Sequence, residues 1–118
     1  MITLRETREK IAGDPEWWAI HLMNFVDDFR YHKRIQAIEE PFIETNDARM
    51  DSLVAATAES LCDELNLETP AWLAQIPDCE EPWFVSGFER LKAITIVESP
   101  LRFRMRKIFV QDNFLSRV

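Results

Sequence analysis

A basic segment interleaved with apolar residues stands near the end of the chain, in the stretch ESPLRFRMRKIFV, residues 98–110. Four cations fall within six residues of it: Arg102, Arg104, Arg106 and Lys107. Guanidinium groups form bidentate pairs with carboxylates and phosphates. The segment could therefore bind a partner protein, a nucleic acid or acidic side chains of its own chain.

The conformation of this segment decides which side chains act together. As a helix, it would project Arg102 and Arg106 on one side and place Leu101, Met105 and Ile108 in one stripe. As a strand, it would alternate the arginines with the apolar residues across two faces. Both conformations display cations over an apolar base. The predicted binding residues are Arg102, Arg104, Arg106, Lys107, Phe103 and, in the preceding loop, Trp83.

The charges of the chain are segregated along its length. The formal net charge is −7, but residues 39–81 contain twelve acidic side chains and a single basic one, Arg49. Residues 98–118 contain five basic and two acidic side chains. Segments of opposite sign favour oriented contacts. These contacts either join the two segments within one fold or bind an external partner, for example with the acidic segment on a basic surface as a nucleic-acid mimic.

Metal chemistry has weak support in the sequence. His21 and His32 share a face of one predicted helix, but a rise of 1.5 Å per residue separates them by about 16 Å, too far to share an ion. Acidic pairs at Asp47 and Asp51, and at Glu59 and Asp63, lack the Glu-x-x-His motif of di-metal helix bundles. We therefore expect a solvated acidic face, with neither a metal nor a cofactor.

Catalytic motifs are not recognisable either. Cys62 and Cys79 lie in no CxxC or CxxH pattern, no serine lies in GxSxG, and the two glycines are too far apart for a phosphate-binding loop. Residues 58–76 imitate a helix-turn-helix, but their second helix contains no basic residue, which disfavours DNA. We expect a non-enzymatic cytoplasmic protein with free thiols and no membrane segment.

Helical periodicity and caps predict the elements of the first two thirds. A helix is expected over residues 3–12, and Asp14-Pro15-Glu16 should begin a second one that extends to about Ile38. Capping residues at 45–47 predict a third helix to about residue 65, and Thr69-Pro70 a short fourth one. The apolar stripe of the second helix comprises Trp18, Leu22, Phe25, Val26 and Phe29.

The C-terminal third has a less uniform pattern. Residues 77–85 are expected to form a loop, and Ser86 to Glu89 fit a capping box for a helix toward Val97. The run AITIV is β-branched, so a strand is the alternative conformation there. Ser99-Pro100 predicts one more short helix. The expected fold is all-α, a compact single-domain bundle of five or six helices over residues 1–118. The alternative is α+β, with short strands in the C-terminal third.

Residues from about 60 onward resemble a family of small bacterial helical proteins. The motifs that carry the resemblance are PAWLAQIP, EPWFVSGFERLKA and ESPLRFRMRKIFV, followed by Asn113, Leu115, Ser116 and Arg117. Met105 and Lys107 depart from the family pattern, which has arginine and asparagine there. Genes of the family often neighbour nucleotidyltransferase-like genes, which implies an antitoxin-like or regulatory partner.

The predicted function is that of a non-enzymatic protein-binding regulator, an antitoxin-like partner of a neighbouring nucleotidyltransferase-type enzyme. The alternative is a nucleic-acid-binding module that uses the basic segment together with Phe109. A hydrolase built on the acidic pairs is the third hypothesis. These three classes differ in what the basic segment and the acidic pairs contact.

Overall fold

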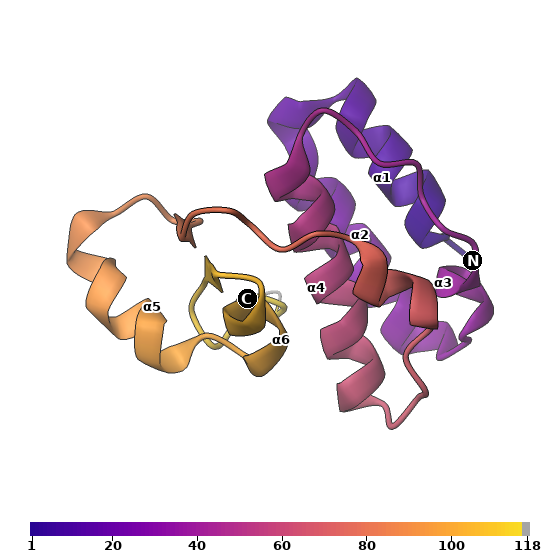
Figure 1. Cartoon of the computed structure of the whole chain (residues 1–118). Helices are drawn as coiled ribbons and strands as arrows, with labels where there is room; N and C mark the ends of the chain where they lie inside the picture. The colour runs from indigo at the N-terminus through magenta and orange to yellow at the C-terminus, as the bar shows by residue number, and fades with distance from the viewer. Residues whose placement is uncertain (117–118) are drawn as a thin grey trace.

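The fold is organised around one long helix, α4 (Ala48–Glu64). The computed structural model describes residues 1–116 and contains six α-helices and one two-stranded sheet in that range (Figure 1). Helices α1 (Leu4–Gly13), α2 (Trp18–His32) and α3 (Gln36–Glu39) lie on one side of α4, and α6 (Leu101–Met105) lies on the other. The predicted bundle of mainly helical elements is confirmed.

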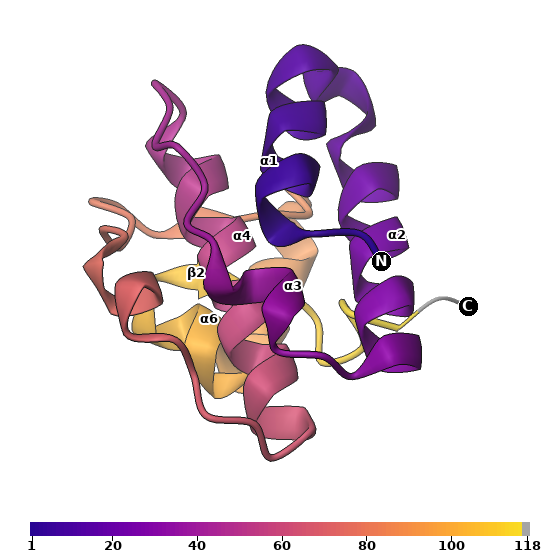
Figure 2. The same cartoon turned by 90° about the vertical axis from the view of Figure 1, so that its right-hand side faces the viewer.

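Helices α1 and α2 lie side by side (Figure 2). Both begin where the capping residues and the proline of the sequence predict. The Thr3 side chain caps α1 by accepting a hydrogen bond of 3.1 Å from the Glu6 N–H. Asp14 and Pro15 lead into a 3₁₀ turn, η1 (Pro15–Trp17), which continues into α2. The predicted helix starts are therefore correct to within one or two residues.

The predicted continuation of the second helix to Ile38 is wrong. Helix α2 ends at His32 because Lys33 adopts a left-handed conformation, with φ of 55°, and donates its N–H to the Phe29 carbonyl at 2.7 Å. The chain turns there and starts α3, whose Ala37 and Ile38 are buried. The break directs both side chains into the core, and the Ile38 carbonyl accepts a hydrogen bond from the Trp72 indole at 2.9 Å.

Helix α4 is buried on nearly all sides. Asp47 caps it by accepting a hydrogen bond from the Met50 N–H at 3.1 Å. A helix covered all round must bury its polar side chains too, and Asp51 and Glu59 are only 3% and 6% exposed. Each binds a buried arginine. The expectation of a solvated acidic face is thus wrong for these two residues.

The chain returns along α4 through η2 (Ala71–Gln75) and an extended loop before the small sheet. Strand β1 (Trp83–Phe84) pairs in parallel with β2 (Ile108–Phe109), with Trp83 opposite Ile108. The C-terminal third therefore contains short strands, but the AITIV run lies in a helix, α5 (Lys92–Glu98). Parallel pairing requires a crossover, and residues 85–107 provide it.

The crossover begins with a turn that the predicted capping box does not form. Gly87, with φ of 72°, donates its N–H to the Phe84 carbonyl at 3.1 Å. Ser86 Oγ accepts a weak bond from the Phe88 N–H at 3.4 Å, and Glu89 only begins a 3₁₀ turn, η3 (Glu89–Leu91). Helix α5 follows and projects away from α4 (Figure 1).

We predict that Lys33→Gly stabilises the protein relative to Lys33→Ala by about 1 kcal/mol, because glycine lacks the Cβ that disfavours the left-handed conformation. Alanine keeps that Cβ, so it is the matched control for loss of the lysine side chain. Urea unfolding followed by circular dichroism measures both variants. Equal midpoints for glycine and alanine would contradict the strain assigned to this helix end.

Candidate protein interface

Arg106 fastens α6 and the C-terminal segment to α4. Its guanidinium donates to Glu59 Oε1 at 2.8 Å, to the Ile76 carbonyl at 2.7 Å and to the Leu73 carbonyl at 2.8 Å. The side chain is only 4% exposed. These donors join α4, η2 and the following loop. Arg106 therefore has almost no surface with which to contact another molecule.

Arg102 binds the same helix one turn further along. Its Nε and Nη2 donate to the two carboxylate oxygens of Asp63 at 2.7 and 3.0 Å, and Glu59 lies 3.8 Å away. Hydrogen bonding to Asp63 raises the pKa of Arg102 above its usual value. Arg102 and Arg106 thus project together, as a helix requires. Two of the four cations in the basic segment are bound by carboxylates of the acidic segment.

The other predicted binding residues are divided between core and surface. Phe103 is fully buried and its ring meets Phe114 edge-on at 5.6 Å between centroids. Trp83 is half-buried beneath the Arg49 guanidinium, 5.5 Å from its ring centroid. Lys107 is exposed and donates to the Glu80 carbonyl at 3.3 Å. Arg104 is exposed and has no ion pair within residues 1–116.

Helix α5 has its polar and apolar sides reversed relative to an ordinary surface helix. Its single buried residue is Thr95, whose hydroxyl donates to the Lys92 carbonyl at 2.9 Å. The outer side carries Ile94, Ile96 and Val97, which are 46%, 49% and 76% exposed. A surface helix normally turns its apolar side toward the core. Here the apolar side is turned to solvent.

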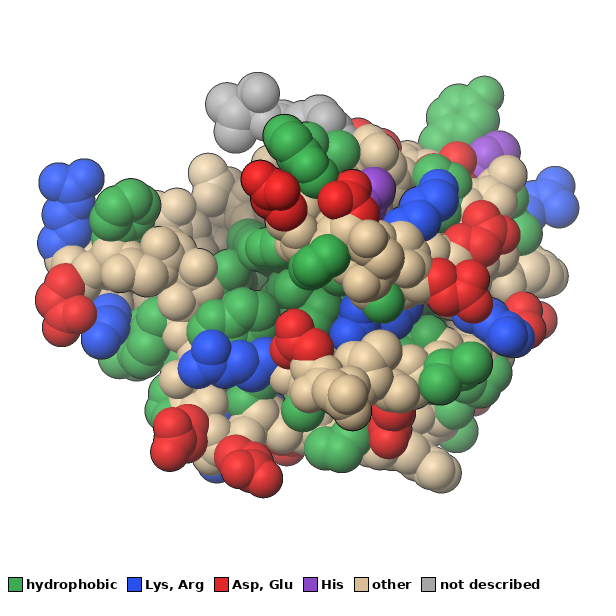
Figure 3. Space-filling view, turned by 90° about the horizontal axis from the view of Figure 1, so that it is seen from above, with side chains coloured by type: hydrophobic (Ala, Val, Ile, Leu, Met, Phe, Trp, Pro, Cys, Tyr) green, Lys and Arg blue, Asp and Glu red, His purple; other side chains and the backbone are tan. Residues whose placement is uncertain are grey.

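Two more exposed apolar side chains lie on α6, the next helix along the chain. Leu101 and Met105 are 60% and 59% exposed, because α6 turns Phe103 inward and Arg102 toward α4. We call this surface the α5–α6 face; it comprises Ile94, Ile96, Val97, Leu101 and Met105. In Figure 3, hydrophobic side chains gather in the recess between the rest of the molecule and the projecting arm formed by η3 and α5, and isolated ones lie on the arm. Single exposed apolar residues are common, but several on adjoining elements mark a contact surface.

Sequence reasoning placed Leu101 and Met105 in an apolar base beneath the arginines and did not identify Ile94, Ile96 and Val97 as surface residues. Apolar residues at positions 93, 94, 96 and 97 cover an arc of about 160° at 100° per residue, which an ordinary surface helix can turn toward the core. The pattern therefore predicts that this side is buried, and the sequence contains no signal that it faces solvent.

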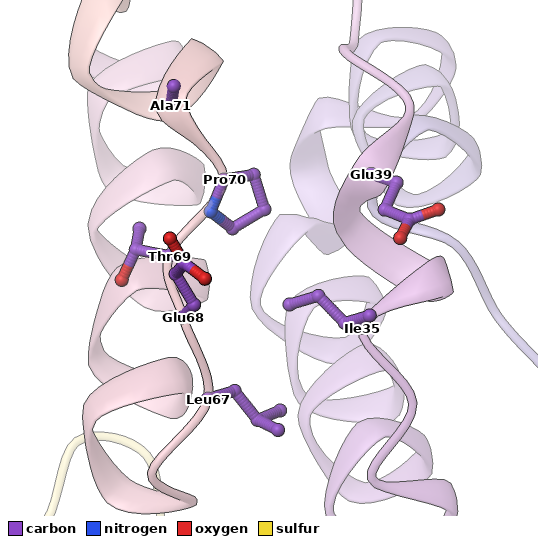
Figure 4. A pocket seen from close by; sticks show the side chains of 7 residues that line it. All are labelled: Ile35, Glu39, Leu67, Glu68, Thr69, Pro70 and Ala71. Carbon is purple, nitrogen blue, oxygen red and sulfur yellow. The ribbon is translucent and has the colours of Figure 1, made fainter.

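A second surface feature is a hollow of about 450 Å³ between α3 and residues 67–71 (Figure 4). Ile35, Leu67 and Pro70 line it, and the carboxylates of Glu39 and Glu68 come from its two opposite walls. Both glutamates are exposed. No buried polar group points into the hollow among its lining residues, so it offers surface shape without a defined set of ligand contacts.

The described part of the chain contains no cluster of three or more residues able to hold a metal ion. Cys62 and Cys79 are buried free thiols. Burial raises the pKa of Cys62 to about 11, which keeps this thiol protonated near neutral pH and makes it a poor nucleophile. No helix within residues 1–116 combines the length and apolar character needed to cross a bilayer.

Comparison of the chain with known proteins identified no relative. No protein-family model matches the chain, and no curated protein or solved structure is significantly similar to it. The resemblance of the C-terminal motifs to a bacterial family therefore stays a prediction.

We predict that Arg106→Ala lowers the free energy of unfolding by about 3–5 kcal/mol, because it leaves the buried Glu59 carboxylate without its partner. Arg104→Ala is the matched control, two residues away and exposed, and should change stability by less than about 0.5 kcal/mol. Chemical denaturation measures both. Equal effects of the two substitutions would show that Arg106 does not fasten the C-terminal segment.

Proposed function

We propose that this chain is a non-enzymatic protein-binding regulator and that its partner covers the α5–α6 face. The observation that carries the proposal is the outward orientation of the apolar side of α5. Complete burial of a large aliphatic side chain contributes about 1.5–3 kcal/mol. The five side chains are about half to three-quarters exposed, so burial of the whole face contributes about 4–9 kcal/mol, which is comparable with the lower part of the roughly 4–15 kcal/mol that association costs.

The C-terminal resemblance supports a more specific role, as an antitoxin-like partner of a neighbouring nucleotidyltransferase-type enzyme. The motif ESPLRFRMRKIFV contains Leu101 and Met105 of the α5–α6 face, and the motif ending in ERLKA leads directly into α5. The surface proposed for binding thus overlaps the residues that carry the resemblance.

The acidic segment is less suited to be the main contact. Six of its twelve acidic side chains already bind arginines of the same chain: Glu40, Asp51, Glu59, Asp63, Glu64 and Asp78. Their charge is largely neutralised within the fold. A nucleic-acid mimic needs many unpaired carboxylates, so the apolar face is the better-supported binding surface.

Nucleic-acid binding through the basic segment is disfavoured because two of its four cations are already paired with carboxylates of the same chain. Arg102 and Arg106 are bound by Asp63 and Glu59, which leaves Arg104 and Lys107 to meet phosphates. Non-specific affinity depends on the number of phosphates that cations neutralise. Two exposed cations on an acidic protein give little affinity at physiological salt.

The proposed function is tested by co-purification of a tagged chain from its native host, with the products of adjacent genes identified by mass spectrometry. We expect Val97→Asp to abolish capture of the partner, because a carboxylate then lies in the apolar interface. The substitution should leave the melting curve nearly unchanged, since Val97 is 76% exposed.

Tyr31→Asp is the matched control, because Tyr31 is 82% exposed on α2 and lies outside the α5–α6 face. It should retain the partner. A partner that is captured equally by wild-type protein and Val97→Asp, but not by Tyr31→Asp, would move the interface to α2 and overturn the assignment.

Nucleic-acid binding is tested separately by fluorescence anisotropy with labelled RNA and duplex DNA. We expect no low-micromolar binding near physiological salt. Binding through two cations would give a log–log salt slope of only about −2, whereas all four cations would give about −4. Micromolar affinity with the steeper slope, lost in Arg104→Ala, would favour the nucleic-acid alternative.

A further inference from the structure

We propose that the α5–α6 face receives an amphipathic helix whose apolar stripe is bordered by carboxylates. This inference rests on the proposed function and adds the chemistry of the partner.

Two arginines stand at the two ends of the face. Arg90 lies in η3, directly before α5, and Arg104 lies on α6 beside Leu101 and Met105. Both are exposed and neither has an ion pair among the residues that the structure describes.

The carboxylates of η3 and α5 cancel only part of this charge. Glu89 is paired with Lys92 at 3.0 Å, and Glu98, half-buried on α5, is the remaining acidic side chain between Arg90 and Arg104. Unpaired cations at both ends of an apolar surface favour a partner with acidic residues at its border. This local charge is opposite to that of the whole chain, which is −7.

The spacing of the face fits a helical partner. Ile94 and Val97 are three residues apart on α5, and Leu101 and Met105 are four residues apart on α6. Each pair forms a short ridge of the kind that fits the grooves of a second helix. The extended residues Ser99 and Pro100 separate the two helices, so each ridge suits a short segment of a partner helix.

A second copy of this chain fits the face poorly. In a two-fold symmetric contact with the helices parallel, Arg90 would meet Arg90 of the other copy; with the helices antiparallel, Arg90 would meet Arg104. Both arrangements place cation against cation at the border, and like charges across an interface are unfavourable. The charges therefore favour a different protein.

The experiment is a selection from a phage-displayed library of helical peptides, each with a fixed leucine stripe and with flanking positions randomised among Glu, Gln and Lys. The full chain is the target, and Val97→Asp is used to remove phage that bind elsewhere. We expect the peptides that remain to have acidic flanks. Their affinity, measured by anisotropy, should fall at least tenfold when the flanking Glu residues are replaced by Lys.

A charge-reversed target, Arg90→Glu with Arg104→Glu, provides the matched control. Both side chains are exposed, so this variant should fold normally, and it should select basic flanks instead. If the wild-type chain instead selects peptides with neutral or basic flanks, the inference that the partner has acidic flanks is overturned. The face would then still be a protein-binding site.

Two other outcomes separate this inference from the proposed function. A selection without any peptide sensitive to Val97→Asp would count against the α5–α6 face itself and so against both. Light scattering should show a monomer at tens of micromolar. A dimer that Val97→Asp dissociates would assign the face to a second copy and overturn the inference.

Discussion

The buried ion pair between Arg106 and Glu59 determines how the C-terminal third is placed on the helical core. Glu59 lies in the middle of α4, and the guanidinium that binds it also caps two carbonyls of the η2 region. A buried carboxylate without its partner is strongly destabilising. The pair therefore fixes the register of α6 on α4, and Arg102 reinforces that register at Asp63 one turn away.

This register explains why the arm projects. With Arg106 fixed, the Lys107 carbonyl accepts the Trp83 N–H at 2.8 Å, and β2 lies beside β1. The residues between the two strands must leave the sheet and return to it. They form the turn at Gly87, then η3 and α5, outside the layer that packs on α4.

Polar contacts hold the inner side of the arm. Ser99 Oγ accepts a hydrogen bond from the Val110 N–H at 2.8 Å and lies 2.5 Å from the Thr95 carbonyl, so the end of α5 is attached to the chain beyond β2. Because Thr95 and Ser99 occupy the inner side, the isoleucines and Val97 of α5 are left outside. The exposed apolar side of α5 thus results from satisfying buried polar groups.

Caps, prolines and the helical period act over a few residues, so local pattern was enough to predict the mainly helical class, most helix starts and the joint projection of Arg102 and Arg106. It could not determine which acids were buried, since Asp51 and Glu59 have the same local pattern as a solvated acidic face. Nor could local pattern place the break at Lys33 or the outward side of α5. The burial of the acids and the placement of α3 depend on contacts between residues that are 30 to 50 positions apart, such as Trp72 with Ile38 and Arg106 with Glu59. The side that α5 exposes depends on the contact of Ser99 with Val110. Only the tertiary structure decides them, because the burial of a charge or an apolar side chain depends on what packs against it.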